Sequence, residues 1–161
     1  MQVERTTAAA SWDGTVPSAF DWRVVGLVVV LAALAASFNL PHGGPAFAAG
    51  AFVLLTAGGL AAHALGERRL RRITTGLAER WDADGARIES VSGSAGLTGT
   101  EWTIRTASGP VVVRGLALAP LSKLSIEWQG TGDVLEASDA EARLDALAEE
   151  WYREVVEFPS A

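Results

Sequence analysis

The sequence predicts a membrane protein in which a two-helix transmembrane hairpin precedes a small cytoplasmic α+β domain. Three features of the 161-residue chain lead to this fold class. Residues 24–66 contain no Asp, Glu, Lys or Arg, as expected of segments that cross a bilayer. Four arginines follow at once in residues 67–72. Beyond them, a helical pattern, about four alternating strands and a final helical pattern predict an antiparallel sheet flanked in sequence by helices.

Two apolar segments, residues 22–40 and 45–65, form the predicted hairpin. The uncharged part of the first has 17 residues and spans about 26 Å as a helix, and the second has 21 residues. The Pro-His-Gly-Gly sequence at 41–44 between them favours a tight turn. A cleaved signal peptide is the first alternative, because residues 33–35 (Ala-Leu-Ala) resemble a cleavage site, but residues 1–21 carry no net positive charge. Two buried helices of a soluble protein are the second alternative, and the length of the uncharged block disfavours it.

The arginines predict the orientation of the hairpin. Arg68, Arg69, Arg71 and Arg72 directly follow the second segment, whereas the turn between the segments has no Lys or Arg. The positive-inside rule therefore places both termini and the domain in the cytoplasm. Trp22 lies where an interfacial aromatic anchor is expected. These five residues are the predicted membrane-interface site, with anionic headgroups as the partner of the arginines. Setting the topology is their simpler role, and binding a particular lipid is the alternative.

Small residues recur in the hairpin at a spacing of four, which permits close contact between helices. The pairs are Ala32 with Ala36, Ala46 with Gly50, and Gly58 with Ala62. Packing of the two helices against each other explains the spacing, and contact with a partner protein would produce the same pattern. His63, near the cytoplasmic end of the second segment, is a functional candidate because it is ionisable. Solvation at the interface is its simpler interpretation.

Three parts are predicted along the chain: a flexible cytoplasmic tail (1–21), the hairpin (22–66) and the cytoplasmic domain (67–161). The domain begins with a helix, since Leu70, Ile73, Leu77 and Trp81 follow helical spacing. Turn-forming residues end this helix near Gly85. The second apolar segment is therefore expected to continue, or to restart, as an amphipathic helix.

About four strands are predicted after this helix, at 86–91, 101–106, 111–118 and 123–129. Their alternation gives the sheet one apolar face, which includes Trp102, Ile104, Leu124, Ile126 and Trp128. The glycine-rich stretch 92–100 is predicted to be a long hairpin loop. It does not end in the Gly-Lys-Ser/Thr of a phosphate-binding loop.

A final helix is predicted from Ser138, with Ser138 as the N-cap and Glu141 completing a capping box. Its apolar stripe is the expected cover for the sheet, and comprises Ala140, Leu144, Leu147, Ala148, Trp151 and Val155. The acidic residues of its other face, Glu149, Glu150, Glu154 and Glu157, are interpreted as a solvated surface. Trp151 is predicted to be a core residue and not a platform for a ligand.

The residue types available limit the chemistry of the domain. The chain has no Cys, and both histidines lie in the hairpin. Ser–His and Cys–His catalysis and zinc sites of His or Cys are therefore excluded for residues 67–161. No catalytic residue, metal or cofactor is predicted. Residues 73–161 have fifteen acidic and seven basic residues, a net charge of −8, which disfavours nucleic-acid binding. Twelve arginines against one lysine, with this acidity, fit a GC-rich genome and a salty cytoplasm such as that of a haloarchaeon.

Two classes of function remain open at this stage. The first is a non-catalytic accessory, scaffold or assembly component whose domain docks a protein partner. The second is a membrane-bound enzyme or transporter component that acts on lipid or small molecules through carboxylates and arginines. Exposed tryptophan with neighbouring apolar surface would favour the first class. A closed polar pocket joining Arg105 or Arg114 to carboxylates would favour the second. The scarcity of catalytic residue types favours the first.

Overall fold

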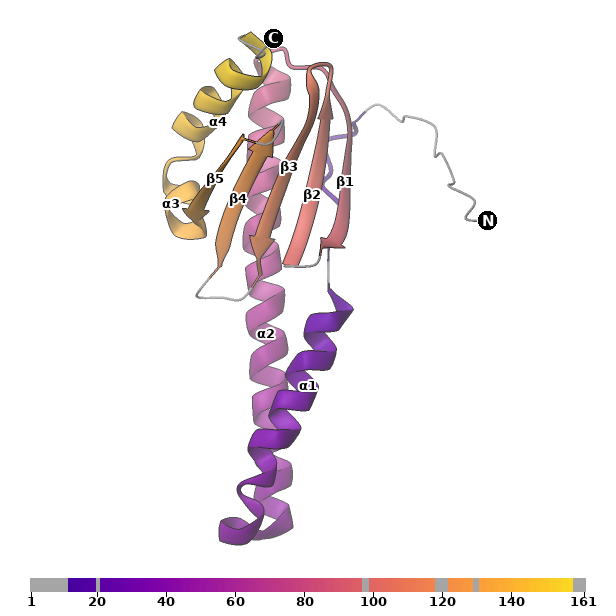
Figure 1. The fold of residues 1–161 in the computed structure, drawn as a ribbon, viewed down its shortest axis with the longest axis vertical. Coiled ribbons are helices and arrows are strands. Elements are labelled where there is room, and N and C mark those ends of the chain that lie inside the picture. Colours follow the sequence, from indigo (N-terminus) through magenta and orange to yellow (C-terminus); the bar gives the residue numbers. More distant parts are fainter. Residues whose placement is uncertain (1–11, 20, 97–98, 118–121, 129–130, 158–161) are drawn as a thin grey trace, which may run out of the picture.

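A computed structural model describes residues 12–19, 21–96, 99–117, 122–128 and 131–157 of the chain. Two long helices are followed by five strands and by short helices (Figure 1). In chain order the elements are α1 (Trp22–Ser37), α2 (Leu40–Ala83), β1 (Ile88–Gly96), β2 (Gly99–Thr106), β3 (Gly109–Leu116), β4 (Lys123–Trp128), β5 (Thr131–Glu136), α3 (Ala137–Ala142), α4 (Leu144–Tyr152) and the π-helix η1 (Arg153–Glu157).

The helices α1 and α2 pack against each other as a helical hairpin, and α2 continues into the domain (Figure 1). Asp21 caps α1, because its carboxylate accepts a hydrogen bond from the backbone N–H of Arg23 at 2.8 Å. The tight turn predicted at 41–44 is not found as such, because the turn lies at residues 38–39 and residues 40–43 already belong to α2. Near its start α2 is kinked at Gly44, which has a φ of 71°. Glycine tolerates this left-handed conformation, and Pro45 then begins the long section of the helix. The second apolar segment and the amphipathic helix after it are thus one continuous element, which ends at Ala83.

The sheet is antiparallel, and its strands are ordered β1-β2-β3-β4-β5. The prediction of about four strands was too low, because Thr131–Glu136 forms a fifth strand beside β4. Its sequence shows no alternating apolar pattern, and its Val134 side chain is 72% exposed. An edge strand with one solvated face does not require that pattern.

The prediction of a long loop at 92–100 is wrong as well. Strand β1 extends to Gly96 and β2 begins at Gly99, so that most of this stretch is paired sheet. Ser94 lies opposite Glu101 and Ala95 lies opposite Thr100. Small polar residues and glycines indicate a loop by propensity, yet an edge strand accepts them when backbone pairing with its neighbour is complete.

The core lies between the sheet and the C-terminal half of α2. Fully buried side chains of the inner face of the sheet meet Leu70, Ile73 and Leu77 of α2, and they include Trp102, Ile104, Val111, Val113, Leu124 and Ile126. The final helix, predicted as the cover of the sheet, mainly packs beside α2. Trp81 Nε1 donates a hydrogen bond to the carbonyl oxygen of Ala148 at 2.9 Å, which joins α2 to α4. As predicted, Trp151 is buried.

The predicted capping box at Ser138 does not form. Helix α3 begins at Ala137, its N-cap is Glu136, and the N-cap side chain makes no capping hydrogen bond. The helical region is also divided at Arg143, between α3 and α4. Glu141, the expected partner of Ser138, instead pairs with two arginines of α2. An ion pair with a distant helix is thus formed in place of a local cap.

Residues 12–19, here called the N-terminal strap, lie against the core before α1 begins. Val16 and Ala19 are buried, and Trp12 is partly buried against the same cluster. Trp102 Nε1 donates a hydrogen bond to the carbonyl oxygen of Pro17 at 2.9 Å. Part of the segment predicted as a flexible tail therefore contributes to the packing of the domain, and residues 1–11 lie outside the described residues.

Candidate functional site

The surface of the helical hairpin is the most unusual feature of the molecule. Among the described residues, every exposed large apolar side chain except Leu116 and Val134 lies between Trp22 and Leu65. By length and composition one helix, α2, is able to cross a membrane. Only 6% of its most apolar stretch of 18 residues is buried, whereas the core helix of a soluble protein would be mostly buried. Helix α1 is also apolar but shorter, with 16 residues.

The two helices contact each other through small residues. An added Cβ at Gly59 would lie 2.6 Å from Val28 Cγ1, so that glycine permits this close approach. Ala32 and Ala36 of α1 and Ala48 of α2 are buried. Of the pairs predicted from their spacing, Ala32 and Ala36 are therefore buried in the hairpin. In contrast, Gly50 and Gly58 have open space where a Cβ would be, and they lie outside this contact.

The five predicted membrane-interface residues lie where the hairpin meets the domain, but their surroundings differ. Trp22, at the start of α1, is 76% exposed, and Arg68 is exposed. Arg69 and Arg72 both reach Glu141 of α3, with N–O distances of 2.8 and 3.5 Å. Arg71 Nε lies 4.0 Å from Glu67 Oε1. The sequence spacing of four indicates the last pair, whereas nothing local indicates the pairing with Glu141, which is about 70 residues away.

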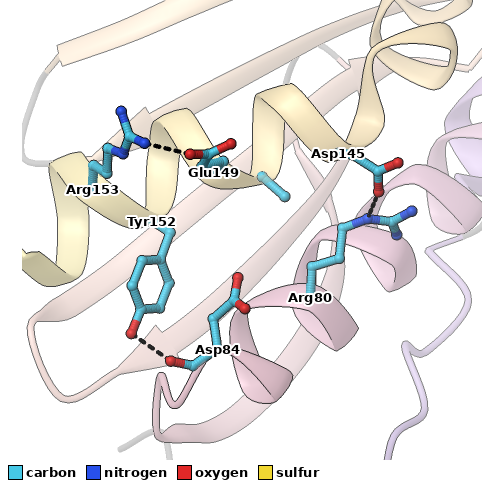
Figure 2. Close-up of a pocket in the computed structure, with 7 residues that line it drawn as sticks. Arg80, Asp84, Asp145, Glu149, Tyr152 and Arg153 are labelled. Atoms are coloured by element: carbon cyan, nitrogen blue, oxygen red, sulfur yellow. Dashed lines mark hydrogen bonds and ion pairs between the residues drawn. The ribbon is translucent and has the colours of Figure 1, made fainter.

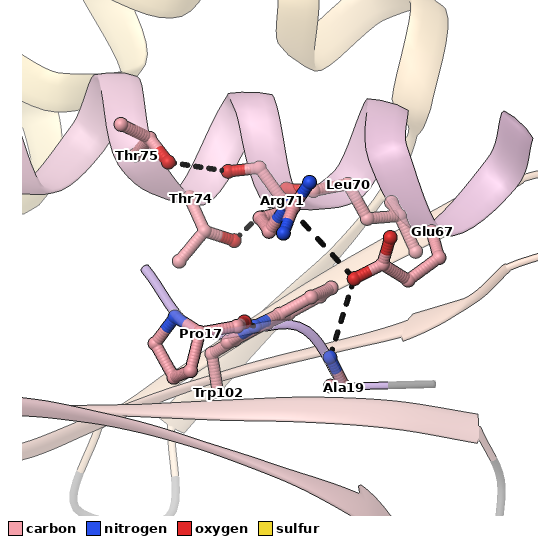
Figure 3. Close-up of polar contacts among 8 residues, drawn as sticks. All are labelled: Pro17, Ala19, Glu67, Leu70, Arg71, Thr74, Thr75 and Trp102. Carbon is pink, nitrogen blue, oxygen red and sulfur yellow. Dashed lines mark hydrogen bonds and ion pairs between the residues drawn. The ribbon is translucent and has the colours of Figure 1, made fainter. Parts of the chain in front are cut away.

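Glu67 is a buried acidic residue at this junction, and sequence reasoning did not single it out (Figure 3). Its Oε1 accepts a hydrogen bond from the backbone N–H of Ala19 at 3.2 Å and faces Arg71. The same side of α2 carries Thr74, whose hydroxyl donates to the carbonyl oxygen of Leu70. Because Ala19 lies two residues before the N-cap of α1, Glu67 holds the entry of α1 against α2.

His63 is buried by the domain, one turn before the first charged residue of α2. Its Nδ1 lies 2.8 Å from the carbonyl oxygen of Ala117, just after the end of β3. The simple interpretation of His63 as a solvated interfacial residue does not describe this environment, because the side chain is 1% exposed. The domain therefore covers the last turn of the apolar segment.

A polar surface pocket lies at the opposite end of the domain, between the end of α2 and α4 (Figure 2). Its lining consists of Arg80, Asp84, Asp145, Ala148, Glu149, Tyr152 and Arg153. Both arginines are paired, Arg80 with Asp145 at 2.5 Å and Arg153 with Glu149. The Tyr152 hydroxyl donates to the backbone oxygen of Asp84 at 2.6 Å. The Arg80 and Tyr152 contacts tie α4 to the end of α2.

Arg114 joins carboxylates as anticipated for the second function class, but on an open surface. It pairs with Glu101 at 2.7 Å and with Glu127 at 3.0 Å, across three strands on the outer face of the sheet. The hydrogen bond and charge of Glu101 raise the pKa of Arg114 above its already high usual value. Arg105 is also exposed. This ion-pair cluster is a cross-strand contact and not a closed pocket.

No protein-family model, curated protein or solved structure matches this chain.

Proposed function

We propose that the chain is an integral membrane protein whose helical hairpin crosses the bilayer twice and holds the α+β domain at the cytoplasmic surface. The domain acts as a non-catalytic accessory, scaffold or assembly component that docks a protein partner. Both termini are cytoplasmic in this proposal, and residues 38–44, through which the chain passes from α1 into the long section of α2, lie outside. The partner is a protein of the same membrane or its surface, and nucleic acid is disfavoured by the acidic domain.

The observation that carries the membrane placement is the exposure of the apolar helices. Leu54 is 75% exposed, Phe38 76% and Val53 62% in a hairpin without a charged residue between Val24 and Gly66. Leaving such a surface in water is unfavourable by about 25 cal/mol for each Å² of apolar area. A bilayer removes that cost, since its hydrocarbon core is as apolar as these side chains.

The short length of α1 is compatible with a crossing. Its 16 residues extend for about 24 Å, against a hydrocarbon thickness of about 30 Å. Local thinning of the bilayer and the turn at the far end accommodate a difference of this size at a modest energetic cost. A signal peptide would be released from the chain, whereas α1 is held through Ala19, Glu67 and its packing on α2.

Single-cysteine labelling tests the topology, because the chain has no cysteine of its own. His42→Cys should react with an impermeant thiol reagent in intact cells, and Val134→Cys on the domain should react only after lysis. His42 is preferred to Gly43, where an added Cβ would come within 2.7 Å of Phe47. Labelling of Val134→Cys with protection of His42→Cys in intact cells would reverse the orientation, and labelling of both would remove the hairpin from the membrane.

The docking role rests on the residue types of the domain, which include neither Cys nor His. The exposed tryptophan that would favour it is not found there, because Trp81, Trp102, Trp128 and Trp151 are all buried. Cross-linking in native membranes followed by purification tests it. One protein, recovered at a fixed ratio and lost when the domain surface is altered by Arg114→Glu, would support docking through the sheet. Recovery of the chain without any stoichiometric protein would count against an accessory role.

The polar pocket favours the second candidate function, a component that acts on a small molecule through arginines and carboxylates. Such a role requires Arg80 or Arg153 to exchange its present carboxylate for a ligand. Arg80→Gln should then abolish a ligand-induced rise in melting temperature in a metabolite screen. A screen without any stabilising compound would leave only the structural role of these pairs.

A further inference from the structure

We propose that the end of the domain where β3 ends and β4 begins rests in the headgroup layer and binds anionic phospholipid. This surface, here called the domain base, is represented by Leu116 and Lys123, which lie opposite each other in the β3–β4 ladder. The inference rests on the proposed transmembrane hairpin and adds to it a second contact with the bilayer, made by the soluble domain itself.

The position of β3 along α2 is the first argument. Gly115 lies against Leu70, since an added Cβ would meet its Cδ1 at 2.4 Å. Two residues later, Ala117 contacts His63. His63 precedes Glu67, the first charged residue of α2, by four positions, or about 6 Å along a helix. The domain base therefore overlaps the uncharged part of α2, since Ala117 lies beside a residue that precedes the first charge. Figure 1 shows this end of β3 beside the middle of α2.

The length of free helix below this contact is the second argument. From Pro45 to Ala62, α2 offers 18 residues, or about 27 Å, before the domain covers it. The hydrocarbon core of a bilayer is about 30 Å thick. No length of apolar helix remains to serve as a spacer between bilayer and domain. If the hairpin crosses the membrane, the domain base must lie at the boundary between hydrocarbon and headgroups.

The residues of the domain base suit that boundary. Leu116 is 46% exposed. Among the described residues outside the hairpin, Val134 is the only other large apolar residue that is exposed. Lys123 is the single lysine of the chain, and its exposed pair with Glu136 at 3.6 Å is weak. An apolar side chain beside a long basic one places methyl groups in the interface and an ammonium group near phosphate.

The distribution of charge along the chain favours anionic lipid as the partner of the domain base. Residues 67–72, at the level of the domain base, hold four arginines and one glutamate, a net charge of +3. Residues 73–161 have a net charge of −8. An anionic surface attracts the first group and repels most of the second, so it favours the orientation with the base toward the bilayer. Each basic residue near such a surface contributes about 1 kcal/mol.

Quenching by lipids carrying a bromine or spin label tests the proposal with the full-length protein in nanodiscs. A polarity-sensitive fluorophore is attached to Leu116→Cys, to Pro110→Cys or to Leu54→Cys, in phosphatidylcholine with or without phosphatidylglycerol. Pro110 is a matched control, because it is exposed on the same face of β3, six residues or about 20 Å further along the strand. Leu54, 75% exposed on α2, reports on the hairpin.

We expect shallow quenchers to affect the Leu116 label several-fold more than the Pro110 label, with a larger effect when phosphatidylglycerol is present. Lys123→Gln should reduce that dependence on phosphatidylglycerol. Quenching of Leu54 with no difference between Leu116 and Pro110 would overturn the contact while leaving the hairpin in place. Equal quenching of Leu116 in both lipids would overturn the preference for anionic lipid. Absence of quenching at Leu54 would show that the hairpin is not in the bilayer, and the inference would fail with it.

Discussion

The indole N–H of Trp102 donates to the carbonyl oxygen of Pro17 across a separation of 85 residues, at 2.9 Å (Figure 3). This contact ties strand β2 to the chain that leads into α1. A second contact, from the N–H of Ala19 to Glu67, ties the same chain to α2. Motion of α1 relative to the domain therefore requires both contacts to break, which makes the N-terminal strap a link between the hairpin and the sheet.

Trp102→Phe should loosen the strap, because it removes the donor to Pro17 while keeping an aromatic ring in the core. The lost hydrogen bond costs about 0.5–1.5 kcal/mol, and the smaller ring adds a packing loss. Faster proteolysis between residues 12 and 19 is the expected result in detergent-solubilised protein. Thr103→Val, on the opposite face of β2, is the control. Unchanged cleavage would mean that packing of Val16 and Ala19 alone holds the strap.

Trp151→Ala should strongly destabilise the domain. Trp151 is 2% exposed and belongs to the main core cluster, and truncating a buried tryptophan costs about 3–5 kcal/mol. The neighbouring Glu150 is exposed, so that Glu150→Ala should change the free energy of unfolding little. Chemical denaturation of the full chain in mild detergent, followed by tryptophan fluorescence, distinguishes the two. Equal midpoints for both variants would show that this helix detaches from the core in solution.

The elements with a strong apolar period could be predicted from the sequence. Leu70, Ile73, Leu77 and Trp81 predict an amphipathic helix, and Trp102 with Ile104 predicts a strand with one buried face. The sequence predicted the final helix as the cover of the sheet, whereas α2 takes that place. The fold class of helices, antiparallel sheet and helices follows from such patterns. Strand β5 and the end of β1 could not be predicted, because an edge strand is stabilised by backbone pairing and leaves little pattern in its side chains.

The candidate site was predictable only in part, for a related reason. The cluster of arginines is visible in the sequence, but its ionic partners are not. Arg69 and Arg72 meet Glu141 only because α3 is brought beside α2 by the chain reversal after β5. The strap shows the same limit, since Pro17 and Ala19 contact the core through backbone atoms. Contacts of this kind depend on tertiary position and leave no residue pattern.

Arg69→Gln should weaken the attachment of α3 to α2, unlike Arg68→Gln. Arg69 places Nε and Nη2 at 2.9 and 2.8 Å from Glu141 Oε2. Since both side chains are about one-third exposed, we expect a loss of no more than about 1 kcal/mol. Thermal unfolding of the two variants in detergent measures it. A similar loss for Arg68→Gln would indicate a general charge effect. Replacing all four arginines by glutamine should weaken the topology while the domain remains folded.

Acidification should release the turn at the start of the strap. Hydrogen bonds from the hydroxyl and backbone N–H of Thr15 lower the pKa of Asp13 below its usual 3.8. A lowered pKa in the folded state stabilises this turn above the unfolded pKa, and that stabilisation is lost as pH falls through the folded value. Proteolysis near Trp12 by an acid-active protease should therefore increase below about pH 4. Cleavage of the Asp13→Asn protein near Trp12 should show no such dependence on pH.

Gly59→Leu should separate the two helices of the hairpin, whereas Gly58→Leu should be tolerated. At Gly59 an added Cβ would already lie 2.6 Å from Val28 Cγ1 and 3.3 Å from its Cγ2, so that a leucine cannot fit without moving α1. At Gly58 nothing lies within 4 Å of the added atom, and leucine there also improves helix propensity by up to about 1 kcal/mol. The distance between spin labels on Cys residues introduced at Leu34 of α1 and Leu54 of α2, both exposed, reports on the contact. It should be longer in the Gly59→Leu protein than in the Gly58→Leu protein. Equal distances in both would show that the glycine contact does not set the separation of the helices.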